Sequence, residues 1–186
     1  MDDDQKLVAD ALAGDLSAFE RLVERHRDVV FRVAARIVGR EEAEDVSQDA
    51  FLRAFNRLSA FRGDAPFRVW LLAITRNAAL NHQARRRAEP VESVEPLMDT
   101  VGAEGRMPAD QLEGRERRDR LEGKVRLLSP SHRVVLVLRD IEGLSYEEIA
   151  DVTETPLGSV KGRLHRAREE LIEILRHNTY DWELPA

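Results

Sequence analysis

Residues 144–168 read LSYEEIADVTETPLGSVKGRLHRAR, and this stretch predicts two short helices joined by a tight turn. Ser145 and Glu148 form an S-x-x-E capping box that starts the first helix. Thr155 followed by Pro156 gives a second start signal, because a threonine oxygen can cap free amides and proline suits the first helical position. The stretch therefore has the pattern of a helix-turn-helix whose second helix begins near Pro156.

The second helix of this pair carries its positive charge on one side. Val160, Leu164 and Ala167 recur at helical spacing and are expected to pack inward. Residues 155–168 contain four Lys/Arg, one His and no acid, although the whole chain has 35 acidic against 29 basic residues. An ordinary helical hairpin with a solvated basic face is the alternative, but this local segregation favours a helix that enters the major groove of DNA. The candidate DNA contacts are Ser159, Lys161, Arg163, Arg166 and Arg168.

Composition narrows the class of protein. With 186 residues and 42% apolar content, the chain can bury one or two small helical cores, and its net charge of -6 excludes a uniformly basic coat protein. The sequence has no cysteine, and its five histidines lack metal-ligand spacing, so we expect no structural metal and no cofactor. The acidic N-terminus has no apolar run, which predicts no signal peptide, no membrane insertion and a cytoplasmic location.

Two amphipathic helices are predicted near the N-terminus. Ser17 and Glu20 form another capping box, after which an apolar stripe runs to Gly39, with His26 expected as a core or boundary residue. A further helix covers about residues 41–58. Its expected inward side chains are Ala43, Val46, Ala50, Phe51, Ala54, Phe55 and Leu58. The acids of its first turns complement the helix dipole, which alone explains their placement, and the same acidic face also suits a basic partner.

A turn followed by a basic helix spans residues 61–87. The turn covers residues 62–66, and the apolar positions that follow it recur at helical intervals. Residues 76–87 hold four arginines, one histidine, two asparagines and no acid. An aromatic-edged loop beside a basic helix suits single-stranded DNA, because extruded bases need stacking platforms and polar partners; a buried Phe-Trp cluster with a solvated arginine tail explains the same residues. The candidate contacts are Phe61, Arg62, Phe67, Trp70, Arg76, Asn77, Asn81 and Arg85.

Residues 88–112 are predicted to form a flexible acidic linker, since they contain three prolines, two glycines, six acids and a single arginine. The second module is expected to start with a charged helix near Glu113 and to restart at Ser129-Pro130. Its expected buried stripe is Val134, Val135, Leu138 and Ile141. The fold class is thus all-α, with two small helical domains and the helix-turn-helix in the second. The expected boundaries are 1–87, 88–112, 113–177 and a tail at 178–186, with the two basic helices held apart and no fixed spacing between them.

The chain resembles bacterial RNA polymerase sigma factors of the extracytoplasmic function (ECF) group of the sigma-70 family, over nearly its whole length. Residues 45–55, DVSQDAFLRAF, resemble the region that binds the polymerase clamp. Residues 61–81, FRGDAPFRVWLLAITRNAALN, resemble the region that melts the promoter and reads its minus-ten element, and residues 138–171 resemble the region that reads the minus-thirty-five element. Gly162 and Asn81 depart from the residues often found in the group, so the preferred promoter sequence stays open.

The resemblance implies a promoter-specificity subunit with no enzymatic activity of its own. Its implied partners are core RNA polymerase, through the beta-prime clamp and the beta flap, promoter DNA and an anti-sigma factor. A flipped base of the non-template strand would lie near Asn77. The implied polymerase-binding residues are Asp45, Gln48, Asp49 and Arg53.

Two other classes of function compete with this interpretation. A helix-turn-helix regulator could bind palindromic DNA as a dimer without polymerase, but this would leave residues 61–87 and the acidic linker unexplained. A helical enzyme acting on nucleic acid would need clustered metal-binding carboxylates or a nucleophile beside a base, and the sequence offers neither.

Overall fold

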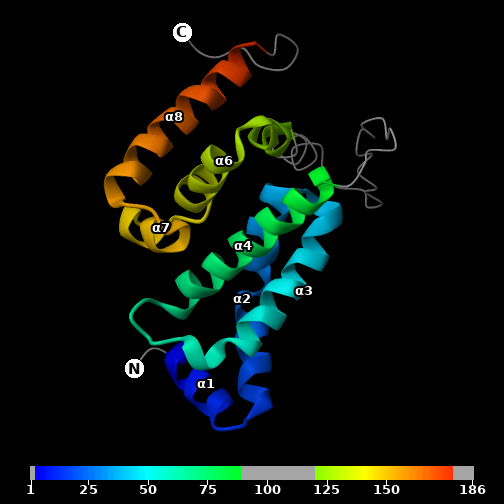
Figure 1. Ribbon diagram of the computed structural model, residues 1–186, viewed down its shortest axis with the longest axis vertical. Coiled ribbons are helices and arrows are strands. Elements are labelled where there is room, and N and C mark those ends of the chain that lie inside the picture. Colours follow the sequence, from blue (N-terminus) through cyan, green and yellow to red (C-terminus); the bar gives the residue numbers. More distant parts are fainter. Residues whose placement is uncertain (1–2, 89–119, 178–186) are drawn as a thin grey trace, which may run out of the picture.

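The computed structural model describes residues 3–88 and 120–177, which fold into helices with no strand among them (Figure 1). The predicted all-α class is confirmed. The N-terminal half contains α1 (Asp3–Leu12), α2 (Leu16–Val38), α3 (Arg40–Asn56), a 3₁₀ turn η1 (Leu58–Ala60) and α4 (Phe67–Ala88). In the C-terminal half residues 120–127 are helical and precede α6 (Pro130–Leu136), a π-helical turn η2 (Val137–Ile141), α7 (Tyr146–Thr153) and α8 (Leu157–Arg176). Most of the predicted linker, the predicted helix start at Glu113 and the tail lie outside the described residues.

Helices α2, α3 and α4 pack together around an apolar core, and α1 lies against α2. Alanines of α3 with no exposed surface leave room for the larger side chains of its neighbours, among them Leu22 and Phe67. The prediction that Phe55 points inward is wrong, since 43% of this residue is exposed, and Phe51 is only partly buried. The alanines already fill the inner face of α3, so Phe55 lies at its margin and meets Phe19 edge to face, with ring centroids 4.9 Å apart.

The starts of the helices follow their capping chemistry, with two corrections. Helix α2 begins at Leu16 because the carboxylate of Asp15 accepts the backbone N–H of Ser17 at 3.0 Å, so the predicted Ser17 box is wrong. The hydrogen bond from the Ser17 hydroxyl lowers the pKa of Asp15.

Helix α1 is held on α2 by Asp4, whose carboxylate lies 2.8 Å from Nε2 of the buried His26.

The helix-turn-helix is confirmed as α7 and α8. The Ser145 side chain accepts the N–H of Glu148 at 3.1 Å, and the Glu148 carboxylate accepts the N–H of Ser145 at 2.7 Å. Thr155, however, does not cap α8: Pro156 is the N-cap residue, and the Thr155 hydroxyl lies 2.7 Å from that of Thr153. The left-handed turn at Glu154, with φ of 52°, redirects the chain and leaves Thr155 beside α7.

The C-terminal half packs α6 against α8, and α7 closes one end of it. Helix α6 starts at Ser129-Pro130 as predicted, and Val134, Val135 and Leu138 are buried. Ile141 was predicted to be buried too, but it is 39% exposed. The π-helical turn changes the phase of the helix between Leu138 and Ile141, so the regular stripe does not continue.

The two halves are packed against each other, with α7 on α4 and α6 on α2 (Figure 1). Their buried residues form one continuous apolar cluster. We expected the basic helices to be held apart with no fixed spacing, so this closed arrangement is a difference from the sequence prediction. Linker composition carries no information about which faces of the two halves attract each other.

Candidate nucleic-acid interfaces

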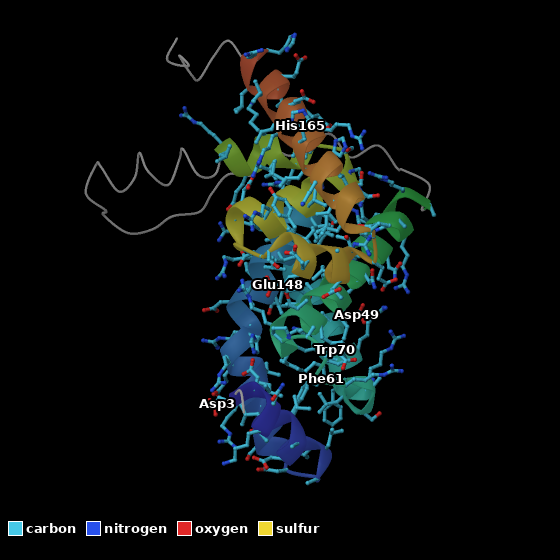
Figure 2. All side chains as sticks on the ribbon, turned by 90° about the vertical axis from the view of Figure 1, so that its left-hand side faces the viewer. Asp3, Asp49, Phe61, Trp70, Glu148 and His165 are labelled. Carbon is cyan, nitrogen blue, oxygen red and sulfur yellow. The ribbon has the colours of Figure 1, made fainter. Side chains whose placement is uncertain are left out.

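The outer face of α8 presents most of the predicted duplex-contacting residues to solvent. Val160, Leu164 and Ala167 pack inward as the helical spacing predicted. With those three buried, Ser159, Lys161 and Arg166 are exposed and Arg163 is half-buried. Figure 2 shows α8 at the upper end of the molecule, with His165 on its outer side. The arrangement offers a continuous basic helix face of the kind that enters a major groove.

Arg168 differs from the other members of this face because it is already paired. Its Nε and Nη2 donate to the two carboxylate oxygens of Asp140 at 3.0 and 2.6 Å. The hydrogen bond to Asp140 raises the pKa of the Arg168 guanidinium. A fork-to-fork pair of this kind fixes the side chain beside η2, so a phosphate would have to compete with Asp140 for it.

An aromatic cluster lies at the N-terminal end of α4, beside the loop that precedes this helix. The ring centroids of Phe61, Phe67 and Trp70 lie 5.4 to 5.6 Å from one another. Phe61 and Trp70 are partly exposed and lie next to each other, as their labels in Figure 2 show. Phe67 is 1% exposed and lies in the core. Its buried ring packs against the rings of Phe61 and Trp70, and a base cannot stack on it.

The basic stretch of α4 is partly covered. Asn77, Asn81 and Arg85 are exposed, as is Arg62 in the preceding loop. Arg76 donates to the side-chain oxygen of Asn77 at 2.9 Å, and its buried Nε has no hydrogen-bond partner among the described residues. Burial lowers the pKa of Arg76, with smaller effects from Glu154, which raises it, and from Arg163, which lowers it. Residues of the helix-turn-helix therefore lie close to the predicted minus-ten face.

A cavity of about 350 Å³ lies between α4 and α7. Trp70 and Asn77 line it from α4, and Asp151 and Glu154 line it from α7. Two of the predicted single-strand contacts thus share a hollow with two acids of the other half. Sequence reasoning did not find this meeting, because the residues lie more than seventy positions apart.

The residues predicted to bind polymerase lie on α3. Asp45 and Gln48 are exposed, while the Asp49 carboxylate pairs with Arg53, with an Nη2–Oδ2 distance of 2.8 Å. Leu52 is 64% exposed on the same helix, and we had not singled it out. It stands with Phe55 as an uncovered apolar side chain within a charged sequence, which is a recognisable signal for a partner surface.

An apolar groove of about 680 Å³ runs along α8 in the other half of the molecule and was also missed. Arg36 and Arg168 stand among its lining residues. Its apolar lining is Leu121, Val125, Leu136, Ile141, Leu171, Ile172 and Leu175. Three of these side chains, Leu121, Ile141 and Ile172, are exposed by 39–44%, so the groove presents apolar surface to solvent.

Neither a metal centre nor a membrane span is found in the part of the chain that the structure describes. Residues 3–88 and 120–177 contain no group of three or more His, Cys, Asp or Glu side chains that could hold a metal ion. Within the same ranges, no helix combines the length and the apolar character needed to cross a bilayer.

Comparison with known proteins matches each half of the chain to a family model. Residues 22–89 match the family model described as Sigma-70 region 2, and residues 118–171 match that described as Sigma-70, region 4. The RNA polymerase sigma-H factor of Pseudomonas aeruginosa is 38% identical over 181 residues, covering 93% of this chain and 94% of the relative. The ECF RNA polymerase sigma-E factor of Escherichia coli K12 is 35% identical over 180 residues, covering 90% and 92%.

Solved structures agree with these matches. CnrH, in complex with the cytosolic domain of CnrY, superposes with a TM-score of 0.71 and 30% identity, covering 95% of this chain and 99% of that one. The sigma factor RpoE of Bartonella quintana, in complex with the anti-sigma factor NepR, shares the fold with a TM-score of 0.63 and 22% identity, covering 86% of this chain and 98% of that one. The chain belongs to the sigma-70 family of RNA polymerase sigma factors, within its ECF subfamily. It is a promoter-specificity factor for transcription initiation, and the polymerase-independent regulator is not favoured.

Proposed function

We propose that the two basic helices divide the promoter between them. Residues 113–177 read the minus-thirty-five duplex through Ser159, Lys161, Arg163 and Arg166, supported by the one-sided exposure of α8. Arg168 joins them once Asp140 releases it. Residues 1–87 melt and read the minus-ten element. The observation that carries the proposal is the segregation of basic and inward-facing residues on α8, which leaves the helix free to enter a groove.

Promoter melting is assigned to the aromatic end of α4 and the residues that follow it. Phe61 and Trp70 offer partly exposed rings on which an extruded base can stack, held in place by the buried ring of Phe67. Asn77 and Arg76 supply an amide and a guanidinium beside those rings, which is the polar complement that a base edge requires. Arg62, Asn81 and Arg85 then hold the backbone of the same strand.

Two surfaces are proposed to bind core polymerase. The first is the face of α3 with Asp45, Gln48, Asp49 and Arg53, to which the exposed Leu52 adds apolar area; this face would dock on the beta-prime clamp. The second is the apolar groove along α8, whose size suits an amphipathic helix such as one from the beta flap. With these two surfaces, polymerase would bind each half of the chain separately.

The remaining assignments follow from this role. The chain is proposed to have no catalytic activity of its own, since the polymerase performs the chemistry, and to work in the cytoplasm, where a promoter-recognition protein meets the chromosome. An anti-sigma factor is proposed as a regulator, supported by the CnrH relative, which was solved with the cytosolic domain of CnrY, and by the RpoE relative, which was solved with NepR.

The decisive experiment is transcription from a library of promoters by purified core polymerase, with and without this chain. We expect a discrete set of promoters, sharing minus-thirty-five and minus-ten motifs, to be initiated only when the chain is present. Absence of any chain-dependent initiation would overturn the proposal. Tight sequence-specific binding by the chain alone, with no effect on initiation, would instead support a polymerase-independent regulator.

A further inference from the structure

Helix α1 lies beside the loop that precedes α4 (Figure 1). It contacts η1, the turn that comes directly before Phe61. The side chain of Gln5 approaches the same loop, since its Nε2 lies 3.8 Å from the position that a Cβ on Gly63 would take. Figure 2 shows Phe61 and Trp70 in the same part of the molecule as Asp3, near the start of α1. Helix α1 is therefore placed to influence the loop end of the aromatic cluster.

A buried carboxylate sets the position of α1 on α2. Asp4 is only 7% exposed, and both of its carboxylate oxygens are paired. Nη1 of Arg25 donates to Oδ1 at 2.7 Å, and Nε2 of His26 lies 2.8 Å from Oδ2. Leu7 and Val8 of α1 are buried as well, but apolar contacts alone tolerate small shifts of a helix. A buried carboxylate is stable only with its partners in place, so the Asp4 pairs favour one position of α1.

His26 connects α1 to the aromatic cluster. It is 6% exposed, and its ring centroid lies 5.5 Å from that of Phe67, with an interplanar angle of 54°. Phe67 in turn meets Phe61 edge to face, with an interplanar angle of 86°, and Trp70 at 39°. Aromatic rings at such separations prefer defined tilted or edge-to-face arrangements. A change in the orientation of His26 should therefore change the orientation of Phe67 and of the two partly exposed rings that pack on it.

Stability alone does not require a polar pair at this place. Replacing a buried ionic pair by apolar side chains of similar volume is often neutral or stabilising, whereas a polar pair can specify one geometry. The contacts that carry the argument all lie within residues 3–70, so they belong to the N-terminal half by itself.

We propose that Asp4 and His26 are positioning residues for promoter melting. Through the buried ring of Phe67, they hold Phe61 and Trp70 at the angles on which an extruded base stacks. Neither positioning residue touches DNA. This proposal rests on the assignment of the two partly exposed rings to the unpaired strand. Helix α1 thus contributes to melting although it carries none of the single-strand contacts.

The first measurement is made on the full-length chain without polymerase. The sequence has two tryptophans, so Trp182→Phe, introduced into every chain of this test, leaves Trp70 as the only tryptophan that emits. Asp4→Ala should then shift the emission of Trp70 to longer wavelength and increase its quenching by acrylamide, because the ring is held less firmly against Phe67.

Asp3→Ala is the matched control for this measurement. It removes the same charge from α1 and takes away an ion-pair partner of Arg25, but it leaves the contact between Asp4 and His26 in place. We expect the emission and the quenching of Trp70 to be the same as in the chain with both aspartates.

The second measurement follows melting by the complete holoenzyme. Asp4→Ala should leave the affinity for core polymerase unchanged and reduce the permanganate reactivity of thymines near the start site about fivefold, because the stacking rings lose their fixed orientation. Val33→Ala controls for stability. It removes buried methyl groups from α2, so it should lower the melting temperature but leave permanganate reactivity unchanged.

A double-variant comparison tests whether Asp4 acts through His26. Asp4→Ala and His26→Ala should each reduce permanganate reactivity, and the chain with both substitutions should lose no more than the weaker of the two single variants. Losses that multiply would show two independent effects and would overturn the connection through His26.

The remaining outcomes separate this proposal from the proposed function. Native quenching of Trp70 in Asp4→Ala, or equal loss of permanganate reactivity in Asp4→Ala and Val33→Ala, would overturn the positioning role. A loss in Phe61→Ala with none in Asp4→Ala would overturn it too, while the melting role of the rings stood. Absence of any open complex with the native chain would instead count against the proposed function.

Discussion

Helices α4 and α8 both carry a basic face, yet the structure exposes one face and partly covers the other. The acid-free part of α8 begins a helix, has its apolar side buried and presents most of its basic side to solvent. Residues 76–87 of α4 end the helix, and their first basic residue, Arg76, is partly buried where α7 packs on α4. Net charge alone therefore does not decide whether a DNA-binding face is available; what packs on it decides.

The difference predicts an order of events on the promoter. The α8 face can meet duplex DNA as it stands, apart from the Arg168–Asp140 pair. The α4 face needs a strand that is already unpaired, and its Arg76 is partly buried where α7 packs on α4. Reading of the duplex can thus precede reading of the single strand without any change within α8.

The largest effect is expected from reversing the charge of the open face. Arg163→Glu together with Arg166→Glu replaces two attractive contacts by repulsion, and a single bidentate base contact is worth about 1–3 kcal/mol. Promoter-dependent transcription by the reconstituted holoenzyme should fall by about 100-fold or more. Arg21→Glu with Arg27→Glu on α2 is the matched control of equal charge change. Equal loss in both double variants would mean that net charge, and not the α8 face, was responsible.

A smaller and more general effect is expected from α3. Asp45→Lys with Asp49→Lys should weaken binding of core polymerase about tenfold, because the substituted face would repel a basic clamp surface that the native acids attract. Fluorescence anisotropy of a labelled chain titrated with core polymerase measures this. Glu20→Lys with Glu24→Lys on α2 provides the same charge change elsewhere. All cognate promoters should lose activity to the same degree, and native affinity in the Asp45/Asp49 variant would refute the clamp assignment.

Substitutions on the partly covered α4 face should separate binding from melting. Asn77→Ala, or Phe61→Ala, should leave polymerase association unchanged and reduce open-complex formation several-fold, since a stacking partner is worth about 1–3 kcal/mol per base. Permanganate reactivity of thymines near the start site reports the unpaired strand. Polymerase binding by the same variants is the internal control. Thymines as reactive as with the native chain would show that this end of α4 does not hold the extruded strand.

The smallest effect concerns the stability of α8. Gly162→Ala should stabilise the helix by up to about 1 kcal/mol, because the added Cβ meets only the Arg166 Nη2 at 3.8 Å. Thermal unfolding should shift upward by a few degrees. Gly143→Ala is the opposing control, since a φ of 74° strains any residue with a Cβ and should destabilise the chain. A lowered melting temperature for Gly162→Ala would show that the glycine is needed by the packing of α8.

Local chemistry made the helix-turn-helix predictable, whereas competing local signals misplaced other boundaries. The Ser145–Glu148 box is read directly from four letters and forms as expected. Asp15 and Ser17 are both good capping residues two positions apart, and only the observed geometry shows that Asp15 accepts the bond. The Ile141 error has another cause, because a π-helical turn leaves no signature in apolar spacing.

The closed interface could not be predicted from the sequence for a different reason. Apolar periodicity assigns each helix one inward face, but the contacts that join the halves include ion pairs and hydrogen bonds as well as apolar packing. Arg32 and Arg68 would each be read as a surface residue on its own, and their partner Glu142 lies 110 and 74 positions away. Without a rule that matches distant charges, the sequence indicates two basic helices and an acidic face but not how they meet.

The π-helical turn at Val137–Ile141 makes the contact between the halves sensitive to the length of the chain. A turn of this kind holds one residue more than an α-helical turn, and here it carries the N–H of Glu142 to the oxygen of Val137, five residues back. Deleting a single codon in η2 would restore a regular α-helix and change which side chain meets Arg32, while every residue of α4 and α8 stayed the same. A change of length in η2 can therefore alter the polar contacts between the halves without changing any residue of the two basic helices.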